Sequence, residues 1–186
     1  MRNSKVTRVK KSIVGKSVPT NIGGHSGRAI EDMFANEGFN IDKHGTLDMP
    51  LEGIEIKSRD EDAVSPHTTG SQTMREIIKK DWEHSPLRDK LQQQLRVFTK
   101  DGRIVRQELW DLTDSTTQAN FKDAYETARA KMIAGDISNT IAGNKWGYFE
   151  KVPDTQDSYI FRHSKGSMEK IEKIMNSTFN DLFAEV

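Results

Sequence analysis

The chain has 186 residues, with 28 basic and 28 acidic side chains, a formal net charge of zero and no cysteine. The lack of cysteine excludes disulfides, zinc–thiolate sites and thiol catalysis. No apolar run approaches the ~20 residues of a membrane-spanning helix, and no apolar segment follows the basic N-terminus as a secretory signal requires. We therefore expect a polar, single-domain protein of the cytoplasm with no membrane partner.

Basic residues are concentrated at the N-terminus. The first 30 residues hold seven basic side chains and no acid, which leaves 21 basic and 28 acidic residues, a balance of −7, in the rest of the chain. We expect residues 1–24 to form a flexible basic arm and residues 25–186 to form the folded domain. Such an arm suggests an anionic partner, for which DNA phosphates are the obvious candidate. The alternative is a solvated tail that only aids solubility.

The first expected helix spans residues 27–36 and is capped by Ser26. Ile30 and Phe34 mark its apolar face. With about 100° between successive residues, Glu31 falls at the edge of that face, from which it can reach a cleft. A solvated helix acid is an equally good interpretation of Glu31 alone.

The pattern Ile-Glu-Ile-Lys at residues 54–57 predicts a strand with Glu55 and Lys57 on its polar face. Asp48 lies upstream of a Pro-Leu-Glu-Gly turn, so it can come from a neighbouring strand and meet Glu55. Two carboxylates and one ammonium would then converge at a sheet edge. Carboxylates are hard ligands for a magnesium-type ion, and the ammonium suits an attacked phosphate. The alternative is a half-buried strand with an ordinary charged outer face.

Asp48, Glu55 and Lys57 resemble, in order and spacing, the core of the PD-(D/E)xK nuclease superfamily, and especially MutH-type nickases and type II restriction endonucleases. In that family an Asp, six residues and Glu-x-Lys form the metal and catalytic core. The family also has a Glu on an N-terminal helix, which Glu31 matches. Leu47, where the family has Pro, is a departure. The resemblance covers roughly residues 20–115.

The resemblance implies a restriction-endonuclease-like α/β fold, in which helices flank a central mixed β-sheet. It implies a Mg²⁺-dependent endonuclease acting on double-stranded DNA, with Mn²⁺ able to substitute, in a prokaryotic or phage-infected cell. Asp48, Glu55 and Glu31 would hold the metal, and Lys57 would complete the catalytic set. One such set gives one cut per subunit, so a double-strand break would need a homodimer or two visits.

Several functions remain open. The same fold serves restriction-like or nicking enzymes as well as homing, junction-resolving and replication-linked nucleases. A non-catalytic module that binds DNA through the basic arm is a further possibility, and so is an RNA nuclease, although no RNA-binding fingerprint occurs.

Downstream of the predicted strand, residues 58–73 predict a hydroxyl-rich loop. Thr73 and Glu76 form a capping box that begins a helix, and Ser85-Pro86 begins another. Residues 95–110 predict a hairpin with an Asp-Gly turn that completes the central sheet. A helix is expected over residues 116–134, then a second hairpin over residues 144–151 and 158–165, and last an amphipathic helix over residues 167–183.

The basic arm, the hydroxyl-rich loop and the second hairpin supply candidate DNA contacts. Hydroxyls and cations commonly contact phosphates and sugars, and an aromatic, basic hairpin can enter a groove. A polar surface loop and a hairpin of core and rim residues are the alternatives. The candidates are Lys10, Lys11, Lys16, Arg28, Arg59, Ser65, His67, Thr68, Thr69, Ser71, Lys145, Lys151, Arg162, His163 and Lys165.

Overall fold

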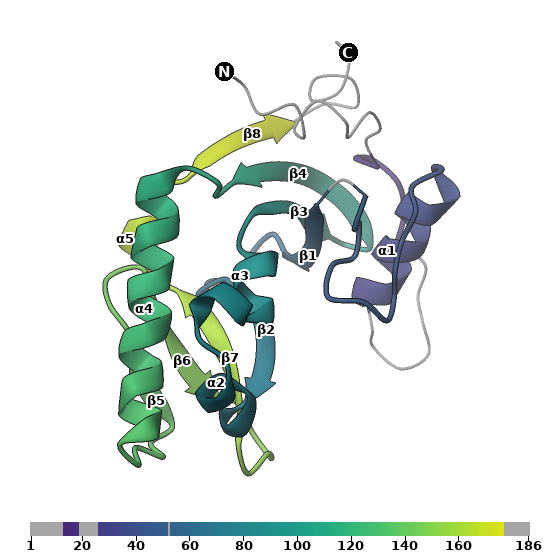
Figure 1. The fold of residues 1–186 in the computed structure, drawn as a ribbon. Coiled ribbons are helices and arrows are strands. Elements are labelled where there is room, and N and C mark those ends of the chain that lie inside the picture. Colours follow the sequence, from purple (N-terminus) through teal and green to yellow (C-terminus); the bar gives the residue numbers. More distant parts are fainter. Residues whose placement is uncertain (1–12, 19–25, 52, 177–186) are drawn as a thin grey trace. The chain divides into compact units, whose positions relative to one another are not determined.

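The structure is a computed structural model, and it describes residues 13–18, 26–51 and 53–176 (Figure 1). Within these residues the chain forms two compact units. The first unit is built from three segments: one that ends at residue 64, residues 92–111, and one that begins at residue 172. The second unit consists of residues 65–91 and 112–171. The chain therefore passes repeatedly between the units.

The first unit contains a mixed four-stranded sheet of order β1-β3-β4-β8. Strand β1 pairs in parallel with β3, whereas β3–β4 and β4–β8 are antiparallel pairs. These elements are β1 (Ile54–Asp60), β3 (Gln93–Lys100), β4 (Arg103–Asp111) and β8 (Glu172–Asn176), with helix α1 (Ser26–Asn36). Strand β1 is an edge strand, so one of its backbone edges is open to other partners.

Alternation in β1 builds the core of the first unit. Ile54 and Ile56 are buried in one hydrophobic cluster with Ile30 and Phe34 of α1. This confirms the predicted inward faces of both elements. The predicted β3–β4 hairpin is also confirmed, and its turn residues, Asp101 and Gly102, have φ angles of 50° and 75°. Two positive φ angles are typical of a type I′ turn, which fits the twist of a hairpin.

Residues 13–18, at the end of the expected flexible arm, pack against the sheet. Ile13 is fully buried, and the Gly15 N–H donates to the carbonyl of Ile104 at 2.8 Å. Ser17 forms an antiparallel bridge with Arg103 on β4. This part of the arm is therefore an ordered neighbour of β4, because its apolar side chains find a place in the core.

The second unit contains an antiparallel sheet of order β2-β7-β6-β5. The long helix α4 contacts β5 and β6, and it also packs against α2 (Figure 1). The strands are β2 (Thr68–Thr73), β5 (Thr140–Ala142), β6 (Gly147–Lys151) and β7 (Ser158–His163). The helices are α2 (Met74–Lys79), α3 (Pro86–Lys90), α4 (Ser115–Ile133) and α5 (Lys165–Met168), with a 3₁₀ turn, η2, at Trp82–His84.

Local capping signals in the second unit are confirmed. The Thr73 hydroxyl accepts from the Glu76 N–H at 3.2 Å, and the Glu76 carboxylate accepts from the Thr73 N–H at 3.0 Å. Ser85 caps α3, with Pro86 at its first position. The helix expected over residues 116–134 is confirmed as α4, and its buried face includes Phe121 and Tyr125. These helix ends could be predicted because the interactions that define them are local.

Three expectations are corrected. The α/β class with a mixed sheet is confirmed, but the single central sheet is replaced by two four-stranded sheets, one in each unit. The expected loop over residues 58–73 contains the end of β1 and all of β2. The helix expected over residues 167–183 is wrong where the chain is described, because β8 pairs with β4 there. None of the described helices is long and apolar enough to cross a membrane.

Candidate active site

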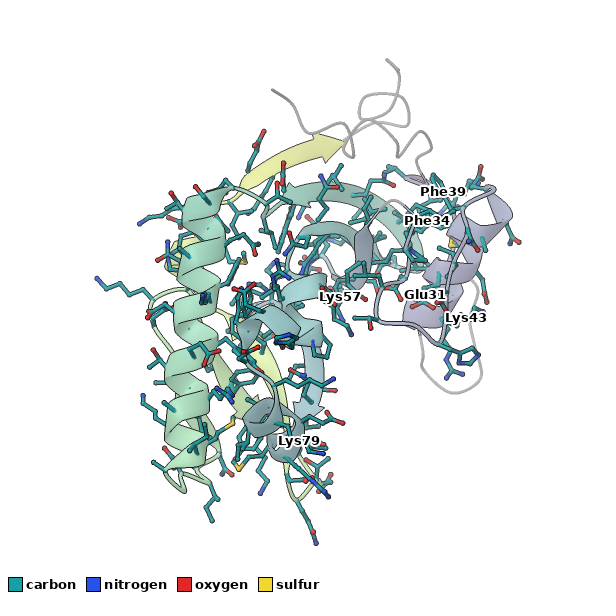
Figure 2. All side chains as sticks on the ribbon, in the orientation of Figure 1. Glu31, Phe34, Phe39, Lys43, Lys57 and Lys79 are labelled. Carbon is teal, nitrogen blue, oxygen red and sulfur yellow. The ribbon has the colours of Figure 1, made fainter. Side chains whose placement is uncertain are left out.

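Glu31 and Asp48 reach the open edge of β1 from two different segments. Glu31 lies on α1, whose Phe34 contacts Phe39 edge to face, with ring centroids 5.9 Å apart. This contact anchors the chain that follows α1 (Figure 2). Farther along, Asp42 accepts hydrogen bonds from the N–H groups of His44 and Gly45, which turns the loop toward Asp48. Packing and loop geometry together therefore place Asp48 beside the strand.

The backbone of β1 holds the Asp48 side chain. Met49 forms an antiparallel bridge with Ile54, and the Ile56 N–H donates to Asp48 Oδ2 at 2.9 Å. Ile54 and Ile56 are two residues apart, so both N–H groups point to the same side of the strand. That side is the open edge, away from β3. The Asp48 side chain is therefore held at Ile56, the strand residue between Glu55 and Lys57, although Asp48 lies in a bend of the preceding loop and not in a neighbouring strand.

Glu31 and Asp48 form a carboxyl pair. Burial raises the pKa of Glu31 above its ordinary value of 4.5, and the charge of Asp48 and a hydrogen bond to it raise the pKa further. The ammonium of Lys43 acts in the opposite direction. Figure 2 shows Glu31 and Lys43 in the same region of the first unit. Two carboxyl groups in contact disfavour two negative charges, so the pair favours a shared proton or a cation.

Glu55 lies in a buried charge cluster on β1. Its side chain is only 4% exposed, and Arg96 of β3 is equally buried. Burial lowers the pKa of the Arg96 guanidinium to about 9, while the negative charges of Glu55 and Glu108 act to raise it. The guanidinium also stacks over the Trp110 ring, 4.4 Å from its centroid. Arg96 therefore compensates the charge of Glu55 in a place where solvent cannot.

Lys57 is half-buried on β1, and its register partner on β3 is Arg96. Figure 2 shows Lys57 on β1 and Glu31 on α1, both in the first unit. The first unit thus holds all four residues of the expected catalytic set. The structure brings Glu31 into contact with Asp48. It also holds the Asp48 carboxylate on the N–H of Ile56, the residue between Glu55 and Lys57.

The fit to a magnesium-type ion is partial. The Glu31–Asp48 pair offers hard oxygen atoms that can coordinate a divalent cation. The charge of that cation would also offset the repulsion between the two carboxylates. Among the described residues, no three His, Asp or Glu side chains are grouped so that they could hold a metal ion. The two carboxylates therefore fit a metal by their chemistry, whereas Glu55 does not join them as a third ligand in this arrangement.

The candidate DNA contacts of the first unit have different surroundings. Lys16 forms an ion pair with Glu37, Arg28 is exposed on α1, and Arg59 is half-buried on β1 near Arg96. Lys10 and Lys11 lie outside the described residues. Arg28 is thus the exposed cation on the helix that carries Glu31.

The remaining candidates belong to the second unit, and two of them are corrected. Thr69 and His163 are fully buried, with Thr69 Oγ1 2.6 Å from His163 Nε2, so both side chains are core residues and not DNA contacts. Arg162 forms an ion pair with Glu150 at 2.7 Å. The others lie at least partly at the surface: Ser65, His67, Thr68, Ser71, Lys145, Lys151 and Lys165.

Sequence reasoning missed Arg96 and Gln72. Arg96 lies between the core residues Leu95 and Val97 on β3, a strand that is buried on both faces. A charged residue within such an apolar strand was the signal that the sequence offered. Gln72 is the second-to-last residue of β2 and lines a cavity in the second unit. Nothing in its local sequence separates it from an ordinary polar strand residue.

No protein-family model and no curated protein sequence matches this chain.

Proposed function

We propose that the chain is a Mg²⁺-dependent DNA endonuclease, with Glu31, Asp48, Glu55 and Lys57 as its working residues. One observation carries the proposal. Asp48 contacts Glu31 and also accepts the N–H of Ile56, the residue between Glu55 and Lys57. A carboxylate from α1 and one from the loop before β1 therefore meet at the edge of the strand that carries Glu55 and Lys57, which supports the proposal.

The chain's own residues have separate tasks in this proposal. Glu31 and Asp48 would supply the oxygen atoms that hold the cation, and the Arg96 guanidinium lies close enough to the buried Glu55 to interact with its carboxyl group. Lys57 lies beside the scissile phosphate and offsets the negative charge that develops during attack. When bound, a magnesium-type ion supplies positive charge at the phosphate and lowers the pKa of a water molecule. The water gives up a proton as its oxygen bonds to phosphorus, and the departing oxygen takes up a proton as its bond to phosphorus breaks. The resemblance implies that this departing atom is the 3′ oxygen, which leaves a 5′-phosphate and a 3′-hydroxyl.

The test is cleavage of supercoiled plasmid with magnesium or with EDTA. Lys57→Ala should abolish cleavage and leave DNA binding largely intact, because the ammonium acts on the reacting phosphate. Lys79→Ala is the matched control, since it removes an exposed lysine of α2 in the second unit, and it should cleave like the unaltered chain. Magnesium-dependent cleavage that persists in Lys57→Ala would contradict the assignment.

A non-catalytic DNA-binding module is the second candidate. It is favoured by the burial of Glu55 and by the lack of a three-ligand group among the described residues. The same plasmid assay separates the two functions. Binding without cleavage of plasmid, mismatched or branched DNA would support the module.

A further inference from the structure

A cavity of about 220 Å³ lies within the second unit. It is formed by the end of β2, by α2 and by α3, and it includes none of the four proposed nuclease residues. Pockets for drug-sized ligands are usually about 300–1,000 Å³, so this one suits a smaller ligand or one portion of a larger one. Its lining residues are Gly70, Ser71, Gln72, Glu76, Lys80, Pro86, Leu87 and Lys90.

Gln72 gives this cavity an unmatched polar group. Both the amide nitrogen and the amide oxygen of Gln72 are buried, and within the described residues neither has a hydrogen-bond partner. An unsatisfied buried amide is costly, and native structures rarely keep one without a reason. A ligand that presents an adjacent donor and acceptor would satisfy both atoms at once. The edge of a nucleobase has this pattern, and glutamine pairs with adenine in this way.

The β2 strand is irregular where it borders the cavity. Its pairing register with β7 shifts between Thr69 and Ser71, which leaves Gly70 without a register partner. Gly70 has a φ of +62°, and a Cβ there would lie 3.3 Å from Lys90 Cδ and 3.5 Å from its Nζ. The bulge and the missing side chain thus make room for the Lys90 chain over the strand. A β-bulge beside a site commonly re-aims the groups around it.

The charges at the rim favour an anion. Lys80 and Lys90 contribute two cations, and Ser71 contributes an exposed hydroxyl. The one acid, Glu76, already accepts the Thr73 N–H in the capping box. Pro86 and Leu87 supply an apolar surface on which a flat ring can lie. A phosphate at the lysines and a planar heterocycle against this surface would use every kind of group present.

We propose that this cavity binds one nucleotide, with its base edge on the Gln72 amide and its phosphate at Lys80 and Lys90. The nucleotide is either a free mononucleotide or one unit of a nucleic acid strand. Both sources offer the same base and phosphate. The proposal does not depend on the nuclease function, because its residues differ from the catalytic set and binding requires no metal.

The test is calorimetric titration of the full chain in EDTA. The probes are the four nucleoside monophosphates, adenosine, inorganic phosphate and a short single-stranded oligonucleotide. Gln72→Leu, which is close to isosteric and lacks both polar atoms, should weaken binding of the preferred nucleotide by about tenfold, as expected for the loss of paired hydrogen bonds. Lys80→Ala should weaken binding similarly, whereas the matched control Lys79→Ala should not. Lys80 is an exposed side chain, so this variant tests the proposal even if Gln72→Leu does not fold.

Each outcome decides the matter. Nucleotide binding that depends on Gln72 and Lys80 supports the proposal. Binding of the oligonucleotide alone with the same dependence identifies a strand as the source. Phosphate binding equal to nucleotide binding and insensitive to Gln72→Leu would overturn it, as would no binding of any probe. Lys57→Ala should bind nucleotide normally, so a failed nuclease assignment would leave this result unchanged.

Discussion

The carboxyl of Glu31 occupies a half-buried position where burial and the charge of Asp48 both disfavour ionisation. Its folded-state pKa is therefore above the ordinary value of 4.5. A raised folded pKa contributes stability that is fully present below 4.5 and is lost as pH rises through the folded pKa. At neutral pH without metal, the negative charge of Glu31 thus works against folding.

We predict that Glu31→Gln melts at a higher temperature than the unaltered chain at pH 7 in EDTA. The expected gain is about 1–2 °C, since the group is partly exposed and solvent screens its charge. The gain in melting temperature should disappear below pH 4.5, where the side chain of residue 31 is uncharged in the variant and in the unaltered chain. Thermal unfolding followed by circular dichroism at the two pH values measures it.

Asp32→Asn is the matched control on the same helix. Asp32 is exposed and forms an ion pair with Lys43, so its neutralisation should give no gain. A higher melting temperature for Asp32→Asn than for Glu31→Gln would show that net charge, not the Asp48 contact, is responsible.

At the scale of elements, the packing of β6 on β7 depends on one glycine. A Cβ at Gly147 would lie 2.1 Å from the tip of the Phe161 ring. Phe161 is fully buried and contacts Phe121, Phe149 and His163 edge to face. The ring therefore has no room to move away from an added methyl group.

We predict that Gly147→Ala lowers the free energy of unfolding by at least about 1–3 kcal/mol, the usual effect of overpacking a core. Gly166→Ala is its control, because a Cβ at Gly166 in α5 meets nothing within 4 Å. That variant should be neutral or slightly stabilised. Urea unfolding of both variants makes the comparison, and equal stability of the two would contradict the packing argument.

Elements were predictable where their signals are local. The capping box at Thr73 and the turn at Asp101–Gly102 depend on neighbouring residues, and both are confirmed. The segment Glu172–Asn176 was expected to be helical because its apolar residues have helical spacing. It is β8 because β4 offers an antiparallel ladder over Gln107–Asp111. Pairing with a strand some 65 positions away leaves no trace in the segment itself, so tertiary contacts override the local pattern.

At the scale of the whole molecule, the sequence did not reveal two sheets. The second unit is formed by residues 65–91 and 112–171, with the β3–β4 hairpin of the first unit inserted between them. Such an insertion leaves no linker rich in Gly or Pro as a boundary signal. The spacing of Asp48, Glu55 and Lys57 could be read from the sequence, whereas the buried Arg96 and the carboxyl contact of Glu31 depend on how separate segments meet.

Charge distribution over the whole chain gives the last prediction, which rests on the DNA partner of the proposed function. Residues 1–12 carry five cations and no acid, on a chain whose net charge is zero. Each phosphate contact by a cation contributes about 0.9 to the slope of log affinity against log salt concentration on B-DNA. Neutralising the five with glutamine should weaken binding and reduce that slope by up to about 4.5. The five residues are Arg2, Lys5, Arg8, Lys10 and Lys11.

The measurement is fluorescence anisotropy with a labelled duplex at several salt concentrations, in EDTA so that no cleavage occurs. The control variant carries five exposed lysines changed to glutamine elsewhere in the chain: Lys43, Lys79, Lys100, Lys122 and Lys170. It has the same net charge as the arm variant. If the arm contacts phosphates, the arm variant should lose much more of the slope than the control. Equal losses would mean that net charge governs binding and that the arm is a solvated tail.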